Sequence, residues 1–170
     1  MSKRNRKRRK AELASRKRSE INLMQGTFVD ANVFLDAILG ESSKGLEFFK
    51  SLRGNAQKVV TSTHAIGEVV KKLHQIAREE KPEPDSDYNV EKHIQAFKGL
   101  LDITNIEIVN FSDKTYELIG KVHSEDSRIK FKDSIHVALA YETACSKFAT
   151  LDKGINAATL RKFELAYADI

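Results

Sequence analysis

Short apolar segments that alternate with longer helical segments constrain this sequence more than any other feature. The short segments cover residues 27–29, 58–61, 106–109 and 148–151 and lack a regular polar alternation. Strands of that kind are buried on both faces, as in a parallel sheet with helices on each side. The sequence therefore predicts an α/β fold, a three-layer sandwich whose central parallel sheet of about four to five strands is flanked by helices.

The intervening segments carry the periodicity and boundary signals of helices. Helices are expected over residues 31–39, 46–52, 90–101, 113–123 and 133–144, and a last helix and short strand are expected to finish near residue 165. A further helix is expected after Ser62 or Thr63, either of which can act as its N-cap. Apolar residues at helical spacing predict its core-facing stripe, which consists of Ile66, Val69, Val70, Leu73, Ile76 and Ala77.

Two segments are expected to connect these elements at the surface. Residues 78–87 include both prolines, Pro82 and Pro84, among mostly charged neighbours, and residues 124–132 are polar. Proline interrupts a helix because it lacks a backbone N–H. Since the first of these segments is too short to divide domains, a single domain is expected over residues 25–170, after a basic arm over residues 1–24.

Positive charge is concentrated in that N-terminal arm. The chain has a net charge of +5 at pH 7, but residues 1–20 hold ten bases and two acids, which leaves −3 for the remainder. Bases bind phosphates through the release of counterions, so the arm is expected to be flexible and to contact a nucleic acid. A solvated tail, a nuclear localisation signal and a transit segment are the alternatives. The candidate nucleic-acid-binding residues are Lys3, Arg4, Arg6, Lys7, Arg8, Arg9 and Lys10.

Composition and missing motifs exclude several classes of protein. The single cysteine, Cys145, cannot form an internal disulfide or a cysteine-rich zinc site, which favours a reducing, cytoplasmic location. Cys145 is also expected to lie in an apolar helix, where a thiolate is disfavoured. No run of about 18 apolar residues is present, so no membrane insertion is expected. The G-x-S-x-G, P-loop and G-x-G-x-x-G motifs are absent as well.

Four acidic residues lie at places where a parallel sheet would bring them together. Asp30 and Asp152 end expected strands, Asp133 begins the apolar helix, and Glu68 follows the second strand. Each also has a structural interpretation: a helix N-cap for Asp30 and Asp133, a turn for Asp152 and a surface position for Glu68. Four adjacent carboxylates repel one another unless a cation neutralises them. Hard oxygen ligands favour Mg²⁺ or Mn²⁺.

Such a site beside a basic arm suits the hydrolysis of phosphodiester bonds, because a bound metal activates water and balances the charge of the phosphate. A non-catalytic RNA-binding or ribosome-associated module, in which the acids no longer hold a metal, is the alternative. A phosphatase with an aspartyl nucleophile would need a second aspartate where the chain has Asn32. His136, one turn after Asp133, is expected to be packed or hydrogen-bonded.

Four segments, taken in order, resemble the PIN-domain nucleases and, within them, the VapC-like toxins of toxin–antitoxin pairs. They are residues 28–35 with D-x-N, 61–69 with an internal glutamate, 133–140 with D-x-x-H-x-A-x-A, and 148–153 with T-x-D. The resemblance implies a PIN-like fold. It also implies a catalytic and metal-binding quartet of Asp30, Glu68, Asp133 and Asp152, with Asn32 and Thr150 as supporting polar residues. Asp113 and Asp126, also near the last segments, are expected to be cap or loop residues.

The same resemblance implies an activity and a set of partners. A member of this family is expected to be an endoribonuclease that hydrolyses RNA with Mg²⁺ or Mn²⁺. It is usually a homodimer and is often inhibited by a cognate antitoxin protein.

Overall fold

The computed structural model describes residues 26–40, 42–53, 57–79, 90–152 and 154–170. The predicted basic arm over 1–24, with its candidate nucleic-acid-binding residues, lies outside the described residues. The two prolines of the expected connection over 78–87 also lie outside them.

Five parallel strands form one sheet in the order β3-β2-β1-β4-β5. The strands are β1 (Gly26–Val29), β2 (Val59–Ser62), β3 (Glu107–Val109), β4 (Cys145–Ala149) and β5 (Ala166–Tyr167). Phe28 of the central strand β1 is in register with Val60 of β2 and with Phe148 of β4. The predicted parallel sheet is therefore confirmed.

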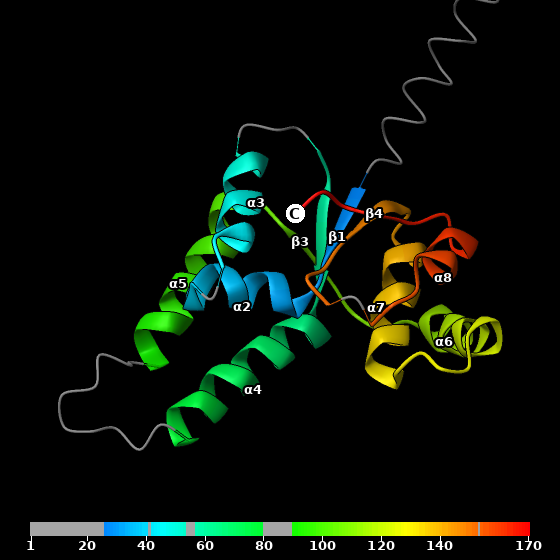
Figure 1. Cartoon of the computed structure of the whole chain (residues 1–170), viewed down its shortest axis with the longest axis horizontal. Coiled ribbons are helices and arrows are strands. Elements are labelled where there is room, and N and C mark those ends of the chain that lie inside the picture. Colours follow the sequence, from blue (N-terminus) through cyan, green and yellow to red (C-terminus); the bar gives the residue numbers. More distant parts are fainter. Residues whose placement is uncertain (1–25, 41, 54–56, 80–89, 153) are drawn as a thin grey trace, which may run out of the picture.

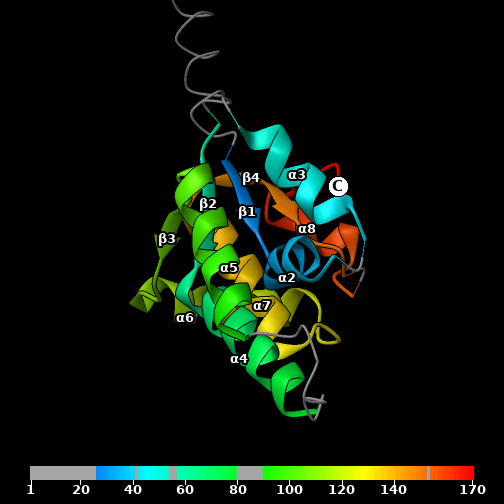
Figure 2. The same ribbon diagram turned by 90° about the vertical axis from the view of Figure 1, so that its left-hand side faces the viewer.

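Helices cover both faces of the sheet and complete the predicted three layers (Figure 1). One face carries α2 (Ala31–Leu39), α3 (Lys44–Leu52), α4 (Thr63–Glu79) and α5 (Val90–Thr104), and the other carries α6 (Asp113–Glu125), α7 (Phe131–Glu142) and α8 (Ala157–Lys162). In Figure 2 the left-hand side of Figure 1 faces the viewer, and α2 to α5 lie in front of the sheet. Among the described helices, none has both the length and the apolar character needed to cross a membrane.

Neighbouring residues of each strand contribute to two separate cores. Phe28, Val60 and Phe148 pack with α6, α7 and α8, whereas Val29 and Ala149 pack with α2 to α5. Successive side chains of a strand point to opposite faces of a sheet. Strands covered on both faces must therefore be apolar at consecutive positions, which is why they lack a polar alternation.

Several expected boundaries were wrong. β4 covers 145–149 rather than 148–151, so Cys145 begins a strand instead of lying in a helix. Pairing of Cys145 with Gly26 of β1 extends β4 toward its N-terminal end. Residues adjacent in the sequence do not predict this pairing. α7 starts at Phe131 with Lys130 as its N-cap, so Asp133 is not a cap. α4 and α6 continue into segments expected to be connections, to residues 79 and 125.

The start of α4 follows the sequence-based expectation. Ser62, the last residue of β2, accepts a hydrogen bond at Oγ from the backbone N of Ala65, 3.1 Å away. This bond satisfies one of the amide donors left free at a helix N-terminus. Val69 and Leu73 of the predicted apolar stripe are buried. α4 therefore leaves the sheet directly from the end of β2.

The turn between α2 and α3 closes on the buried carboxylate of Asp36. This carboxylate accepts hydrogen bonds from the backbone N of Ser42, at 2.8 Å, and of Gly45, at 2.7 Å. A Cβ atom on Gly45 would lie 2.5 Å from the carbonyl oxygen of Val33 and 2.8 Å from the backbone N of Ala37. Only glycine allows α3 to approach α2 this closely.

Replacing Gly45 tests this close approach. We expect Gly45→Ala to lower the free energy of unfolding by about 1–3 kcal/mol, the usual cost of forcing extra volume into a packed site. Gly120→Ala is the matched control, because Gly120 lies in a helix with no heavy atom near its added Cβ. It should stabilise by about 0.5–1 kcal/mol. Urea unfolding measures both, and equal effects would contradict the predicted clash.

Asp36 should make stability depend on pH. Burial raises its pKa, but the hydrogen bonds from Gly45 and Ser42, together with the charge of Lys44, outweigh burial and leave the pKa below its ordinary 3.8. The folded state therefore favours the ionised form. This stabilisation is complete above the unfolded pKa and is lost as the pH falls through the folded pKa.

We expect Asp36→Asn to lower the free energy of unfolding at pH 7 by about 1–3 kcal/mol. The deficit should shrink as the pH falls below about 3.8. Urea unfolding across this pH range measures the effect, with exposed Asp113→Asn as the control. A deficit that stays constant with pH would contradict the assignment of this stabilisation to the ionised carboxylate.

Candidate functional site

A cleft of about 280 Å³ opens beside the carboxyl ends of β1 and β4. These strands are neighbours, but the chain continues from β1 to β2 on one side and from β4 to β5 on the other. Open α/β sheets bind ligands where the strand order reverses in this way. All four acids singled out from the sequence line this cleft, namely Asp30, Glu68, Asp133 and Asp152.

Asp30 is held rigidly at the end of β1. Its Oδ1 accepts a hydrogen bond from the backbone N of Ala31, at 2.7 Å, which makes Asp30 the N-cap of α2. Its Oδ2 accepts hydrogen bonds from Asn32 Nδ2, at 2.9 Å, and from Thr150 Oγ1, at 2.8 Å. Asn32 Oδ1 in turn accepts from the backbone N of Leu151, at 3.0 Å. The residues predicted to be supporting therefore join the end of β1 to the end of β4.

Glu68 and His136 come from opposite faces of the sheet and meet in the cleft. His136 Nε2 lies 2.8 Å from Glu68 Oε2 and 3.4 Å from Asp30 Oδ1, while Lys132 Nζ lies 3.7 Å from Glu68 Oε1. His136 is 1% exposed and hydrogen-bonded, as expected. The hydrogen bond to His136 outweighs burial and lowers the pKa of Glu68, so this carboxylate is ionised at neutral pH.

Asp133 has the least favourable surroundings of the four acids. Its side chain is buried, and its Oδ2 atom has no hydrogen-bond partner among the described residues. Burial raises the pKa of Asp133, and the negative charges of Asp152 and Asp30 raise it further against the opposing effect of Lys132. Because buried polar atoms are nearly always satisfied, this oxygen is the atom that a cation would suit best.

Asp152 stabilises a turn, as expected, and also lines the cleft. It is exposed, and its Oδ1 accepts a hydrogen bond from the backbone N of Gly154, at 2.8 Å. The three aspartates are not packed around one point. Among the described residues, only His64, Glu68 and His136 bring three ligand atoms within 4.8 Å of one another. A wider set of carboxylates fits Mg²⁺, which usually keeps several of its waters.

Sequence reasoning gave no function to the lysines of the cleft. Lys71, Lys72 and Lys132 line it beside the acids. Lys71 and Lys72 follow Glu68 by three and four residues, a spacing that places them on its side of a helix. That spacing is the signal that could have identified them. They add positive charge at the opening of an acidic cleft.

Asp113 and Asp126 do not line the cleft, and the expectation that both are cap or loop residues is confirmed for Asp126 and wrong for Asp113, because Ser112 is the N-cap of α6. Asp113 is the first residue of α6 and is exposed. Asp126 is the C-cap of the same helix, and its carboxylate accepts hydrogen bonds from the backbone N of Arg128, at 3.1 Å, and from Thr159 Oγ1, at 2.8 Å. These bonds account for Asp126 as a structural group.

Comparison with solved structures shows the same fold in distant proteins. VapBC2 from Rickettsia felis, solved with a promoter DNA fragment, is 15% identical, with a TM-score of 0.61 over 85% of this chain and 98% of the other. FitAcB from Neisseria gonorrhoeae is 15% identical, with a TM-score of 0.56 over 84% and 96%. Mycobacterium tuberculosis VapC20, a sarcin–ricin loop-cleaving toxin, is 17% identical, with a TM-score of 0.52 over 75% and 90%.

Identities this low establish the fold alone, so family membership depends on the sequence. No match was found among curated protein sequences. The family model of the PIN domain, however, matches residues 27–159. This range contains β2, β3 and β4, nearly all of β1, and all four acids of the cleft. The chain therefore belongs to the PIN-domain family.

Proposed function

We propose that this protein is a metal-dependent endoribonuclease that hydrolyses RNA phosphodiester bonds in the cleft of about 280 Å³. Asp30, Asp133 and Asp152 would hold Mg²⁺ or Mn²⁺, and Glu68 would be a further ligand or would orient the attacking water. The Oδ2 of Asp133, which has no hydrogen-bond partner in the described part of the chain, carries the proposal. An ionised carboxylate buried without a partner is costly, and a cation removes that cost.

The protein's own part in the reaction is mainly positional. A divalent ion bound there supplies water activation near neutral pH and balances the charge of the phosphate. Asn32 and Thr150 hold the carboxylate of Asp30 in one orientation. In the second of its two possible roles, Glu68, kept ionised by His136, would accept a hydrogen bond from the attacking water and direct it toward the phosphorus.

Two observations support RNA as the substrate. Lysines at the cleft can contact phosphates, and the predicted basic arm would add affinity without sequence preference. VapC20, with the same fold, is described as cleaving the sarcin–ricin loop. A larger cavity of about 710 Å³ is lined by Thr150, Asp152, Arg128 and Tyr167, and we assign it to the nucleotide next to the scissile phosphate.

The biological setting that we propose is a toxin–antitoxin pair in the cytoplasm. Its support is the fold shared with VapBC2 and with a toxin–antitoxin complex from Klebsiella pneumoniae. Tyr116 and Phe131 are each 65% exposed, and large exposed apolar groups suit a protein interface. An antitoxin and a second copy of this chain are the proposed partners.

Removing the charge of Asp133 should separate activity from stability. We expect Asp133→Asn to lower kcat/KM for RNA cleavage at least about 100-fold, because a metal ligand is lost. Without metal, the same change should raise Tm, since it removes a buried charge that is repelled by its neighbours. Fluorescent-RNA cleavage with Mn²⁺ or EDTA and a thermal melt measure the two effects.

Asp113→Asn is the matched control, because Asp113 is exposed on α6. It should cleave RNA like the wild type. Full activity of Asp133→Asn or of Asp30→Asn would reject the proposed mechanism. If calorimetry shows no Mn²⁺ binding at millimolar concentrations while RNA still binds, the chain is a non-catalytic RNA-binding module.

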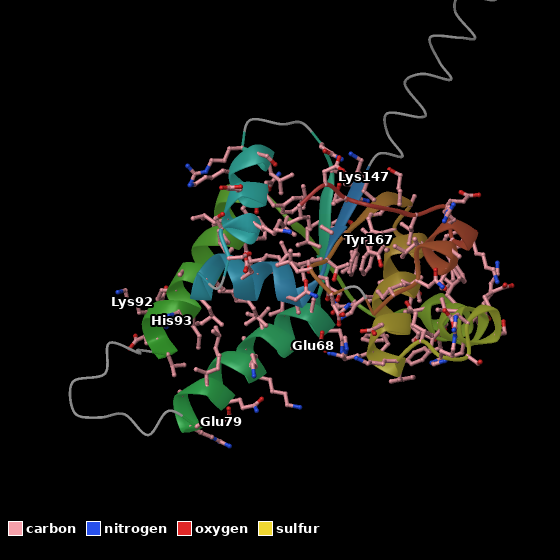
Figure 3. The ribbon with its side chains drawn as sticks, viewed as in Figure 1. Glu68, Glu79, Lys92, His93, Lys147 and Tyr167 are labelled. Carbon is pink, nitrogen blue, oxygen red and sulfur yellow. The ribbon has the colours of Figure 1, made fainter. Side chains whose placement is uncertain are left out.

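The lysines at the cleft should contribute to RNA affinity. In the inactive Asp133→Asn background, Lys72→Gln should weaken RNA binding and reduce the slope of log K against log salt by about 0.7, the value for one contact to a single strand. Lys147→Gln is the control, because Lys147 is exposed and lies well away from Glu68 (Figure 3). Equal slopes for the two variants would exclude Lys72 as a phosphate contact.

A further inference from the structure

We propose that His64, Glu68 and His136 form a binding site for a transition-metal ion of the zinc class, distinct from the aspartate ligands of the proposed catalytic ion. One nitrogen from each histidine and one oxygen of Glu68 all lie within 4.8 Å of one another. Imidazole suits Zn²⁺, Co²⁺ and Ni²⁺, whereas Mg²⁺ and Mn²⁺ prefer oxygen ligands. Two imidazoles and one carboxylate therefore define a site of different selectivity.

Two packed elements hold these side chains. His64 and Glu68 are four residues apart on α4, so they lie on the same side of the helix. His136 comes from α7, which packs on the other face of the sheet. The ring centroids of the two histidines are 5.2 Å apart. Figure 3 shows Glu68 near the start of α4, close to α7. The first residues of α7, among them Asp133 and His136, line the cleft.

The histidines also retain free coordination capacity. His64 Nε2 and His136 Nδ1 are buried atoms without a hydrogen-bond partner among the residues that the structure describes. Buried ring nitrogens without partners are costly. Coordination of a metal by His64 through Nε2 would satisfy that atom, whereas His136 faces Glu68 through Nε2 rather than Nδ1. This observation is independent of the distances within the cluster.

The set is slightly wider than a loaded zinc site. Zinc–nitrogen distances of about 2.0–2.1 Å place tetrahedral ligand atoms about 3.4 Å apart. The largest separation here is at most 4.8 Å, whereas Glu68 Oε2 and His136 Nε2 are 2.8 Å apart, so a metal requires the widest pair to approach and this pair to separate. Three protein ligands leave a fourth position to water or to a phosphate oxygen.

Binding at this site would affect the neighbouring acids. His136 Nε2 now contacts both Glu68 and Asp30, and a zinc ion would replace the hydrogen bond between His136 and Glu68 and occupy an oxygen of Glu68. Zn²⁺ is therefore an inhibitor of RNA cleavage that competes for Glu68. This consequence rests on the proposed nuclease function, whereas the binding of zinc does not.

Metal titration of the full chain tests the site without any measurement of cleavage. We expect one Zn²⁺ per chain by calorimetry, and a tetrahedral Co²⁺ absorption spectrum that Zn²⁺ abolishes. His64→Gln should weaken Zn²⁺ binding at least about 10-fold. His74→Gln is the matched control, because His74 is exposed on the same helix, and it should bind like the wild type.

Two further variants separate this site from the aspartate ligands. Glu68→Gln should also weaken Zn²⁺ binding, while Asp133→Asn should retain it. Thermal melts establish that each variant is folded before titration. Wild-type zinc affinity in both His64→Gln and Glu68→Gln, or its loss in Asp133→Asn alone, would overturn the proposal. Absence of RNA cleavage with Mn²⁺ would reject the nuclease and leave the zinc result unaffected.

Discussion

Several carboxylates are buried in this protein, and each charge must be compensated. How this is done determines the turn between α2 and α3 and the chemistry of the cleft. Asp36 is satisfied by backbone N–H groups and closes the turn between two helices. Asp30 is satisfied by a helix N-terminus and by Asn32 and Thr150. Asp133 keeps one oxygen without a partner among the described residues. The first two carboxylates are satisfied by the fold, and the third is the reason why we propose a cation in the cleft.

The topology of the sheet explains why these groups meet. β1 and β4 lie side by side, but the chain reaches β4 only after completing β2 and β3 on the far side of β1. The helices that follow β2 and β3 therefore lie on opposite faces, and the cleft receives Glu68 from one and Asp133 from the other. Because the cleft lies between helices of the two outer layers, it brings together Glu68 and Asp133, whose local environments differ.

Local signals predicted much of the fold and failed at particular boundaries. Ser62 capped its helix, and the apolar strands identified a sheet covered on both faces, because both depend on neighbouring residues. Cys145 was misplaced because pairing with Gly26, more than one hundred residues away, decides that it starts β4. Asp133 was expected as a cap, but α7 begins two residues earlier.

The sequence by itself determined the α/β class, the parallel sheet and the identity of four acids worth placing, since hydrophobic pattern and strand ends are local properties. Only the tertiary structure decided how these acids differ. Hydrogen bonds from Thr150 to Asp30 and from His136 to Glu68 join residues far apart in the chain. Burial and the distances between charges control whether a carboxylate is satisfied or left for a cation. Both depend on packing between layers, which no local pattern encodes.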